Sequence, residues 1–512
     1  MIQQCKLHDF FNPDQPFLKS CGLAIIDTPL RVKARVLKGP VLQYKTSEME
    51  VAQANWRPPM NFKLLVPATC TKWSIYGVLS ARDTFSKDHL SKFADAFMRR
   101  CRERGMEMAN PTEVEILPQP PTEGKSPDYC VREKIKAAGF NDTRLVFFIT
   151  SEFITIHKHV KLQERYSCVA TQDLKLKTAL NYLEKGQSLT MDNIVFKTNL
   201  KLGGINYAIN LKNVVGTRVD PFKPTRLILG IGFSHAPQMQ VFTRSGVKIP
   251  APAVVGYCAN MGRHPTEFIG DLIYQHSKKD DLLLCTTEML QNVIDRFTGA
   301  VDEGGKRTGE MTKALPKEMI VYRQGVAEGF YAMCLGEEVP LMKALLAKNG
   351  AKDVKVTYIV VQKEHNIRLM PVHIDPREKP TQQNITSGVV VDQEITHPRY
   401  REFFLNSHIT LQGTARTPRY TVLCDDGNIS MNELQSVTHA LCHDFQIVNS
   451  PVSIPAPLYI ANRYSERGVA LYVAKATDDL ATSNQKNRNK NEDYNIDLVY
   501  GRTALGKTRI NA

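Results

Sequence analysis

The sequence predicts an α/β protein with two successive α/β domains behind a short β-rich segment. Apolar runs typical of buried strands, among them LVFFIT (145–150), RLILGIGFS (226–234) and TYIVVQK (357–363), are separated by long stretches with a helical pattern. Alternation of buried strands with helices favours parallel sheets that are covered by helices. At 512 residues the chain also exceeds what a single core usually holds, so several domains are expected.

The β-rich segment is expected over residues 1–80. VKARVL (32–37) alternates apolar with basic residues, as a half-buried strand does, and a second short run ends at Tyr44. The first α/β domain is expected over 81–220 and the second over 221–512. Strands of the second domain are predicted at 226–234, at EMIVYR (318–323) and at 357–363.

An amphipathic helix is predicted to open the first α/β domain. Ser86 can cap its beginning, and Gly105 can end it. One face of this helix is kept apolar by Leu90, Phe93, Phe97 and Cys101. The helix is followed by a Pro-rich loop and then by the apolar run 145–150, which is the order expected in an α/β unit.

Charge and cysteine usage narrow the class of protein further. Lys and Arg exceed Asp and Glu by 14, which favours encounter with polyanions, either nucleic acid or an acidic membrane surface. The sequence holds no apolar run of about eighteen residues, so no membrane-spanning segment is expected. The eleven cysteines include no CxxC pair, which argues against a disulfide framework or a zinc finger. Reduced thiols indicate a cytoplasmic protein, with a nuclear location left open.

Six segments match one protein family in its order and approximate spacing. They are KTNLKLGGIN (197–206), VYRQGVAEG (321–329), TYIVVQKEHNIRL (357–369), VVVDQEITHP (389–398), SHITLQGTARTPRYTVLCDD (407–426) and PVSIPAP (451–457). The chain thereby resembles the MID and PIWI domains of eukaryotic Argonaute proteins. The resemblance implies a segment like the family's second linker at 1–80, a MID domain with a Rossmann-like parallel sheet at 81–220, and a ribonuclease H-like PIWI domain at 221–512. The family's N-terminal half with its PAZ domain is not matched, which implies a short isoform or a fragment.

The resemblance also implies a cleavage site whose metal positions are vacant. A ribonuclease H-like centre cleaves RNA with two Mg²⁺ ions that are held by carboxylates. The family's metal positions fall on Gly232, Gln324 and Asn462, and its inserted glutamate falls on Glu288. A single carboxylate cannot hold two metal ions. We therefore expect no catalytic residue, no bound metal, no cofactor and no enzymatic activity.

Two alternatives remain open at this point. One is an RNA-guided endonuclease whose metal site is rebuilt from Glu288 with Asp392 or Asp425, although structural or solvated roles are favoured for those aspartates and for Asp426. The other is a truncated regulatory isoform that binds partners without holding RNA productively.

A pocket for the 5′ phosphate of a guide RNA is the second site that the resemblance implies. The matching residues are His157, Lys161, Gln172, Lys197, Lys201 and Arg467. Lys197 and Lys201 are four residues apart on one helix face, where two ammonium groups repel each other unless an anion or solvent screens them. A solvated basic face would be the simplest interpretation of an isolated pair, and for Arg467 it has equal weight. The setting beside Lys161 and Gln172 favours phosphate binding.

His157 stands where the family usually has a tyrosine that stacks on the first guide base. Together with Lys158, His159 and Lys161 it adds positive charge, which favours a more highly charged ligand. The worm-specific branch of the family, which this chain resembles, lacks cleavage residues and binds secondary siRNAs with a 5′ triphosphate. We therefore expect such an RNA as the guide.

The guide backbone is expected to contact a further group of residues, His408, Thr414 and Arg416, which match family positions with that role. Lys363 and Arg368 are expected to be solvated. The expected function is that of a cleavage-incompetent Argonaute that binds a small guide RNA. Its guide would pair with complementary target RNA, and silencing would proceed through effector proteins, with no membrane involved.

Overall fold

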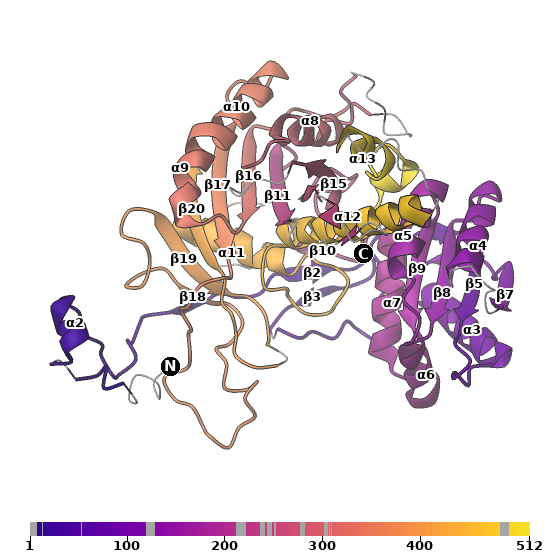
Figure 1. The fold of residues 1–512 in the computed structure, drawn as a ribbon, viewed down its shortest axis with the longest axis horizontal. Coiled ribbons are helices and arrows are strands. Elements are labelled where there is room, and N and C mark those ends of the chain that lie inside the picture. The colour runs from indigo at the N-terminus through magenta and orange to yellow at the C-terminus, as the bar shows by residue number, and fades with distance from the viewer. Residues whose placement is uncertain are drawn as a thin grey trace.

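The computed structural model describes residues 8–512 other than 13, 53, 119–127, 211–221, 236–240, 243–247, 250–251, 277–281, 302–305, 307, 309, 411 and 482–490. These residues form two α/β domains that lie side by side, with the smaller one on the right in Figure 1. Both domains have a central sheet covered by helices on its two faces, which confirms the predicted α/β class.

The smaller domain is built on a parallel sheet whose described strands have the order β7-β5-β8-β9. Their bounds are β5 (Trp73–Val78), β7 (Glu113–Ile116), β8 (Leu145–Thr150) and β9 (Ala170–Lys175). One face packs against α3 (Lys87–Glu103), α6 (Leu176–Lys185) and α7 (Ser188–Lys201), and the other against α4 (Tyr129–Phe140) and α5 (His157–Ser167). Because β5 lies in this sheet, the domain begins before residue 81, the boundary predicted from the sequence.

Two local predictions for this domain are confirmed. Strand β8 coincides with the apolar run 145–150, and all six of its residues are buried. The Ser86 side chain caps α3 by accepting a hydrogen bond from the backbone N–H of His89. Gly105 follows the helix with a φ of +94°, a conformation that glycine adopts without strain.

The larger domain is built on a sheet in which nine described strands have the order β1-β18-β19-β20-β17-β16-β11-β14-β15. Their bounds are β1 (Arg35–Val36), β11 (Arg226–Ser234), β14 (Ala253–Ala259), β15 (Ile269–Gln275), β16 (Glu318–Gln324), β17 (Lys355–Gln362), β18 (Val389–Val391), β19 (Arg401–Asn406) and β20 (Arg419–Asp425). Strands β11, β16 and β17 are parallel to one another, and the other pairings are antiparallel.

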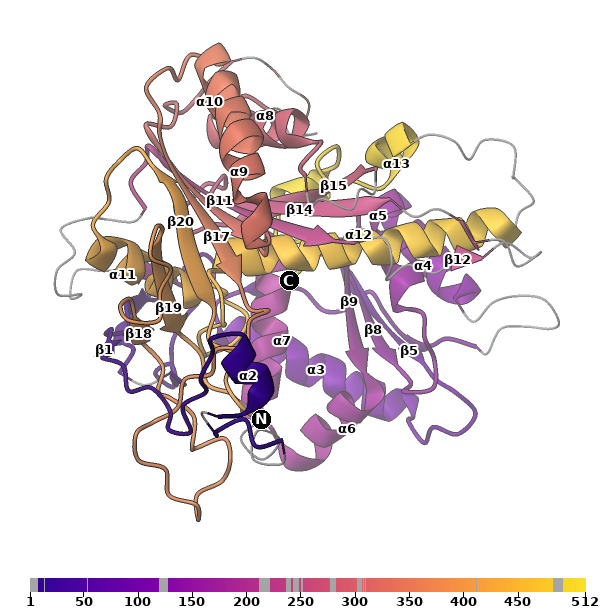
Figure 2. The same ribbon diagram turned by 60° about the vertical axis from the view of Figure 1, so that its left-hand side comes forward.

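The two faces of this large sheet are covered by different helices. Helices α8 (Thr286–Phe297) and α10 (Val339–Lys348) pack on one face, while α11 (Met431–Cys442) and α12 (Ala456–Ala481) pack on the other. Figure 2 shows α12 as a long helix that runs below the sheet and reaches the smaller domain, where it contacts α5. Helix α12 thus joins the two domains.

Glycines let α12 approach the sheet closely. Gly230 and Gly232 are two residues apart on β11 and therefore face the same side, and Gly256 on β14 lies opposite Gly232 in the register. A Cβ atom at any of these positions would collide with the backbone of α12, for example at 2.7 Å from the Asn462 nitrogen for Gly232. The helix could not lie where it does if larger residues replaced them.

The predicted segment 1–80 does not form a unit of its own. β1 joins the edge of the large sheet, β2 (Val41–Gln43) lies between β3 (Glu48–Glu50) and β10 (Ala208–Asn210), and β5 belongs to the smaller domain. The remaining elements are α2 (Pro16–Ser20), β4 (Thr69–Cys70), β6 (Glu107–Met108), β12 (Val241–Phe242), β13 (Lys248–Ile249), η2 (Glu328–Phe330), α9 (Tyr331–Met333), η3 (Cys334–Glu338), α13 (Asn491–Asp497) and η5 (Ala504–Lys507).

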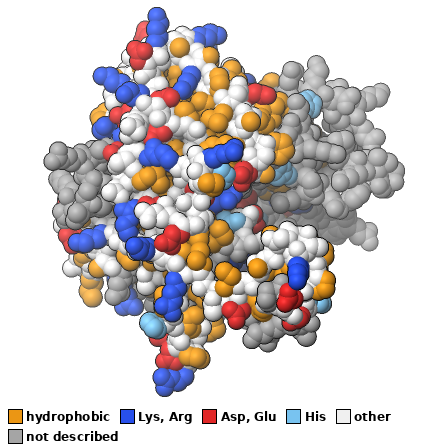
Figure 3. All heavy atoms as spheres, turned by 90° about the vertical axis from the view of Figure 1, so that its left-hand side faces the viewer, with side chains coloured by type: hydrophobic (Ala, Val, Ile, Leu, Met, Phe, Trp, Pro, Cys, Tyr) orange, Lys and Arg blue, Asp and Glu red, His pale blue; other side chains and the backbone are white. Residues whose placement is uncertain are grey.

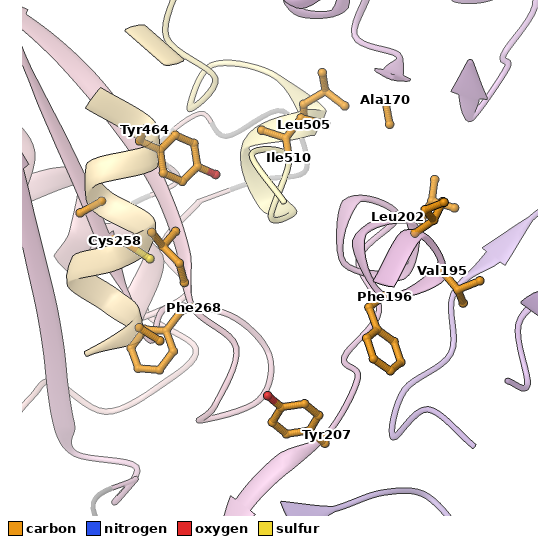
Figure 4. Packing of buried hydrophobic residues seen from close by; sticks show 14 of the residues in the cluster. Ala170, Val195, Phe196, Leu202, Tyr207, Cys258, Phe268, Tyr464, Leu505 and Ile510 are labelled. Carbon is orange, nitrogen blue, oxygen red and sulfur yellow. The ribbon is translucent and has the colours of Figure 1, made fainter. Parts of the chain in front are cut away.

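The C-terminal residues are part of the core that lies between the domains. Figure 4 shows Leu505 and Ile510 between Tyr464 of α12 on one side and Ala170 of the smaller domain on the other. All four side chains are buried. In the part of the chain that the structure describes, no helix is both long and apolar enough to cross a membrane.

Candidate nucleic-acid interface

Four charged side chains meet where α5, α7 and α12 converge. We call Lys161, Glu164, Lys201 and Arg467 the charged cluster. Lys161 and Glu164 come from α5, Lys201 ends α7, and Arg467 lies on α12, so the cluster is shared by both domains. The side chains of Lys161, Glu164 and Arg467 are only 2%, 0% and 10% exposed, and Lys201 is buried as well.

Two residues of β9, Thr171 and Gln172, connect the lysines of the cluster. Lys161 Nζ donates to Glu164 Oε2 at 2.9 Å, to Thr171 Oγ1 at 2.6 Å and to the Thr171 carbonyl at 3.0 Å. Lys201 Nζ donates to the same carbonyl at 2.9 Å and to Gln172 Oε1 at 2.8 Å. The two lysines are therefore held together by a shared acceptor.

Arg467 and Tyr500 complete the cluster from the side of the larger domain. Arg467 Nη1 donates to Glu164 Oε1 at 3.0 Å and to the Tyr500 hydroxyl oxygen at 3.2 Å. The Tyr500 hydroxyl lies 3.3 Å from the same Glu164 oxygen. Glu164 is thus the one carboxylate that contacts cations of both domains within the cluster.

Burial opposes every charge in this cluster. It raises the pKa of Glu164, but Lys161, Arg467 and Lys201 and a hydrogen bond from Thr171 outweigh it and bring that pKa to about 2. Burial, followed by the charge of Lys161, holds the pKa of Lys201 well below its usual range. The cluster thus contains three basic side chains and one carboxylate. Such a site favours an incoming anion.

Lys197 lies one helical turn before Lys201 and is only partly buried. Among the described residues, its Nζ has no hydrogen-bond or ion-pair partner. Burial and the nearby charge of Arg463 lower its pKa. Lys197 therefore offers an unpaired cation close to the charged cluster.

The two histidines of the site point to different surroundings. His157 is 56% exposed, and its Nδ1 lies 3.1 Å from Asp173 Oδ2. His159 is buried, and its Nδ1 lies 2.7 Å from Arg132 Nη2, with carboxylates of Asp128 and Asp478 at 3.7 and 3.6 Å. His159 therefore belongs to a separate ionic group that contains two carboxylates, which offsets the positive charge predicted for it.

Both imidazoles have pKa values below the ordinary one. The hydrogen bond with Asp173 raises the pKa of His157, but burial and the charges of Lys161 and Arg467 outweigh it. Burial is the main cause for His159. Both side chains are consequently neutral at pH 7.

The structure brings four of the six predicted phosphate-pocket residues, Lys161, Gln172, Lys201 and Arg467, into one hydrogen-bonded group. His157 and Lys197 lie beside it without a direct bond to it. The sequence analysis missed Glu164, Thr171 and Tyr500. The spacing of Lys161 and Glu164, three residues apart on one helix, is a signal that could have revealed the ion pair. No comparable signal exists for Tyr500, which is distant in the sequence.

The residues predicted to contact the guide backbone lie on and near the segment between β19 and β20. Thr414 and Arg416 are exposed, and Arg416 Nη1 lies 3.7 Å from Glu364. His408 is half-buried, and burial together with the charge of Lys363 lowers its pKa to about 4. Lys363 is not simply solvated as expected, because its Nζ donates to Ser453 Oγ at 2.9 Å. Arg368 donates to backbone carbonyls of its own loop.

Positive charge is not restricted to these sites. On the face shown in Figure 3, Lys and Arg side chains are spread among acidic and apolar ones rather than gathered in one patch. On this face, the basic side chains therefore do not mark a single binding surface.

Three of the four predicted degenerate catalytic positions lie together. A Cβ atom at Gly232 would collide with Asn462 Oδ1 and lie 2.9 Å from the backbone carbon of Ala461. Gln324 Oε1 accepts a hydrogen bond from the backbone N–H of Phe233 at 2.7 Å. Gly, Gln and Asn provide no carboxylate at this location.

Glu288 lies on the opposite face of the large sheet. It lines a cavity of about 480 Å³ together with Tyr257, Asp271 and Arg296. Tyr257 packs in the core under α8 and α10, whereas Gly232 faces α12. The structure therefore does not bring Glu288 to the other three positions.

The carboxylates of the alternative metal site are separated and engaged elsewhere. Asp392 lies 2.7 Å from Arg35 Nη2, close to the strands at the sheet edge. Asp425 lies 2.5 Å from Arg401 Nη1 and accepts a hydrogen bond from Thr357 Oγ1 at 3.0 Å. Across the described residues, no group of three or more His, Cys, Asp or Glu side chains is arranged to hold a metal ion.

Comparisons with known proteins identify the family. The Piwi domain model matches residues 144–473. The chain is 33% identical over 502 residues to Argonaute protein wago-1 of Caenorhabditis elegans, covering 98% of this chain and 50% of that protein. It is 33% identical over 488 residues to Argonaute protein wago-4 of the same organism, covering 90% and 47%.

Solved structures show the same fold. The crystal structure of Kluyveromyces polysporus Argonaute with a guide RNA matches with a TM-score of 0.74 at 18% identity, covering 94% of this chain and 57% of that one. The C-terminal lobe of a budding yeast Argonaute matches with a TM-score of 0.74 at 19% identity, covering 94% and 95%.

The fold is that of the MID and PIWI domains, with a ribonuclease H-like PIWI domain. The chain belongs to the Argonaute family, as the sequence motifs indicated. The names of the two worm relatives agree with its predicted place in the worm-specific branch. The chain spans about half the length of these curated relatives.

Proposed function

We propose that the chain binds a small guide RNA through the RNA's 5′ phosphate and silences complementary RNA without cleaving it. The observation that carries this proposal is the charged cluster with Lys197 beside it. Its buried cations outnumber the single carboxylate among them, so a phosphate supplies charge that the protein itself lacks. Base pairing of the guide then supplies the sequence specificity, while the protein holds the backbone.

The absence of cleavage is proposed from the environment of Gly232. A two-metal reaction needs carboxylates that clamp both ions. Gly232, Gln324 and Asn462 provide none, and α12 occupies the space that a side chain at 232 would need. Because Glu288 lies across the sheet, it does not compensate. Silencing would then depend on effector proteins recruited to the target, in the cytoplasm or the nucleus.

We further propose that the 5′ end of the guide RNA carries a triphosphate. Support comes from Lys197, which has no partner among the residues that the structure describes, and from His157, which is exposed beside the charged cluster. His159 contributes less than the sequence suggested, because it faces Asp128 and Asp478. The extra phosphates would therefore be held chiefly by Lys197 and His157.

RNA that co-purifies with the protein tests this function. Small RNAs are sequenced with and without prior 5′-polyphosphatase treatment, from wild type and from the double variant Lys197→Ala, Lys201→Ala. We expect a discrete class of short RNAs that is recovered mainly after the treatment and is depleted in the variant. A matched control is Lys177→Ala with Lys185→Ala, two exposed lysines on α6 of the same domain. Equal RNA recovery from both double variants would contradict the proposed pocket.

A further inference from the structure

Glu164 is a carboxylate in the middle of a site that is otherwise built to attract anions. Its side chain is fully buried. Oε2 accepts from Lys161 Nζ, from the Thr171 backbone N–H and from Thr171 Oγ1 at 2.9, 2.9 and 2.5 Å, while Oε1 faces Arg467 and Tyr500. Such a carboxylate occupies positions around the cations that a phosphate oxygen could otherwise take.

Lys161 shows the consequence most clearly. An ammonium group has three N–H donors, and all three of Lys161 are used by Glu164 and by the two oxygens of Thr171. Lys201 uses two, and Lys197 uses none within the described residues. A phosphate that approaches this site must displace Glu164 from Lys161 or accept repulsion from a buried carboxylate nearby.

We propose that Glu164 is a specificity-determining residue of the 5′-end pocket. Its carboxylate is a built-in counter-anion that competes with the guide's 5′ phosphate for Lys161 and Arg467, and it thereby sets how strongly the protein prefers a phosphorylated end over a hydroxyl end. This inference rests on the proposed function of the site.

The same carboxylate stabilises the protein when no RNA is bound. Without it, Lys161, Lys201 and Arg467 would be three buried basic side chains that make no hydrogen bond to a carboxylate among the described residues. Removal of one partner from a buried ion pair is strongly destabilising. Glu164 also joins α5 of the MID domain to Arg467 and Tyr500 of the larger domain. Glu164 therefore lowers the affinity for phosphate and at the same time stabilises the RNA-free protein.

The test compares two otherwise identical RNAs with a 5′ monophosphate or a 5′ hydroxyl, bound to wild type and to Glu164→Gln. The measured quantity is the ratio of the hydroxyl Kd to the phosphate Kd. We expect this ratio to rise about tenfold or more in the variant, the change that one regained charge-assisted hydrogen bond provides. Inorganic phosphate should raise the Tm of the variant by more than it raises that of wild type.

Asp192 supplies a matched control. It is a buried carboxylate on α7 that pairs with Arg100 and Arg104 of α3 and makes no contact with the charged cluster. Asp192→Asn should lower the Tm and leave the ratio unchanged. An unchanged or lowered ratio in Glu164→Gln, with a phosphate preference present in wild type, would overturn this inference. A wild type without any phosphate preference would instead overturn the proposed function.

A second pair of variants keeps the test informative when Glu164→Gln does not fold. Lys161→Met removes the main partner of Glu164, and the double variant Lys161→Met, Glu164→Gln removes one charge of each sign. The carboxylate repels phosphate in the single variant only, so the ratio should be about tenfold higher in the double variant. Equal ratios in these two proteins would overturn the inference.

Discussion

The two candidate sites of this chain differ in the charge of the side chains that form them. Around Lys161 and Lys201, charged side chains are buried at a cost and held by a network that spans two domains. Around Gly232, the positions that would hold metal ions are small or neutral, and α12 fills the space. Charge that is costly to bury is retained where a phosphate would bind and is missing where a metal would bind. This difference supports the proposal of binding without cleavage.

Substitution of Gly232 by aspartate tests how firmly the second site is closed. In Gly232→Asp the new Cβ atom lies 2.7 Å from the Asn462 nitrogen, so α12 must move and a carboxylate is buried as well. We expect the free energy of unfolding to fall by about 3 kcal/mol or more. Chemical denaturation measures this, and Gly427→Asp is the control, because Gly427 is exposed and a Cβ there meets no atom closer than 3.6 Å. Equal stability of the two variants would show that the site is open.

Removal of both lysines of α7 tests the first site. In Lys197→Ala with Lys201→Ala, the affinity for a 5′-phosphorylated RNA should fall by roughly two orders of magnitude, since each charge-assisted bond contributes about 1.5 to 3 kcal/mol. The slope of log affinity against log salt should also become shallower, because fewer phosphates are neutralised. Titrations at several salt concentrations, with Lys177→Ala and Lys185→Ala as the control, measure both quantities. Identical slopes in wild type and variant would mean that the lysines do not meet the RNA.

The pH dependence of triphosphate preference should give a smaller effect. The pKa of His157 lies below its ordinary value of about 6.5, so the imidazole is neutral at pH 7 and gains charge only as the pH falls below that value. The preference for a 5′ triphosphate over a monophosphate should therefore rise severalfold toward acid pH. Competition binding from pH 7.5 to 5.5 measures it.

Two substitutions separate the imidazole from the titration of the RNA itself. His157→Tyr should flatten the pH profile, since a phenol stays neutral over this range. His373→Tyr, at an exposed loop position, should leave the profile as in wild type. A profile that His157→Tyr does not alter would show that His157 does not cause the pH dependence.

Local features of the fold could be predicted from the sequence because their causes are local. The apolar runs 145–150 and 226–234 became buried strands, and Ser86 capped the expected helix. The distribution of residues 1–80 over four sheets could not be predicted. It depends on pairings such as Arg35 with Val390, whose partners are far apart in the sequence.

The residues of the candidate site were likewise predictable from the sequence only in part. Motifs identified Lys161 and Lys201, because a resemblance preserves residue type and spacing. They could not show that Glu164 and Tyr500 would complete the cluster, since these contacts depend on how α5 and α12 pack. Nor could they show that Glu288 and Gly232 would face opposite sides of one sheet.

A single-turnover assay tests the central claim most directly. The protein is loaded with a 5′-phosphorylated guide and given a fully complementary labelled target with Mg²⁺, and both retention and cleavage of the target are followed. Binding without cleavage predicts that the target is retained intact, and that retention is lost with Lys197→Ala and Lys201→Ala. A target that is cut opposite the guide, with product that disappears in Glu288→Ala, would contradict the claim.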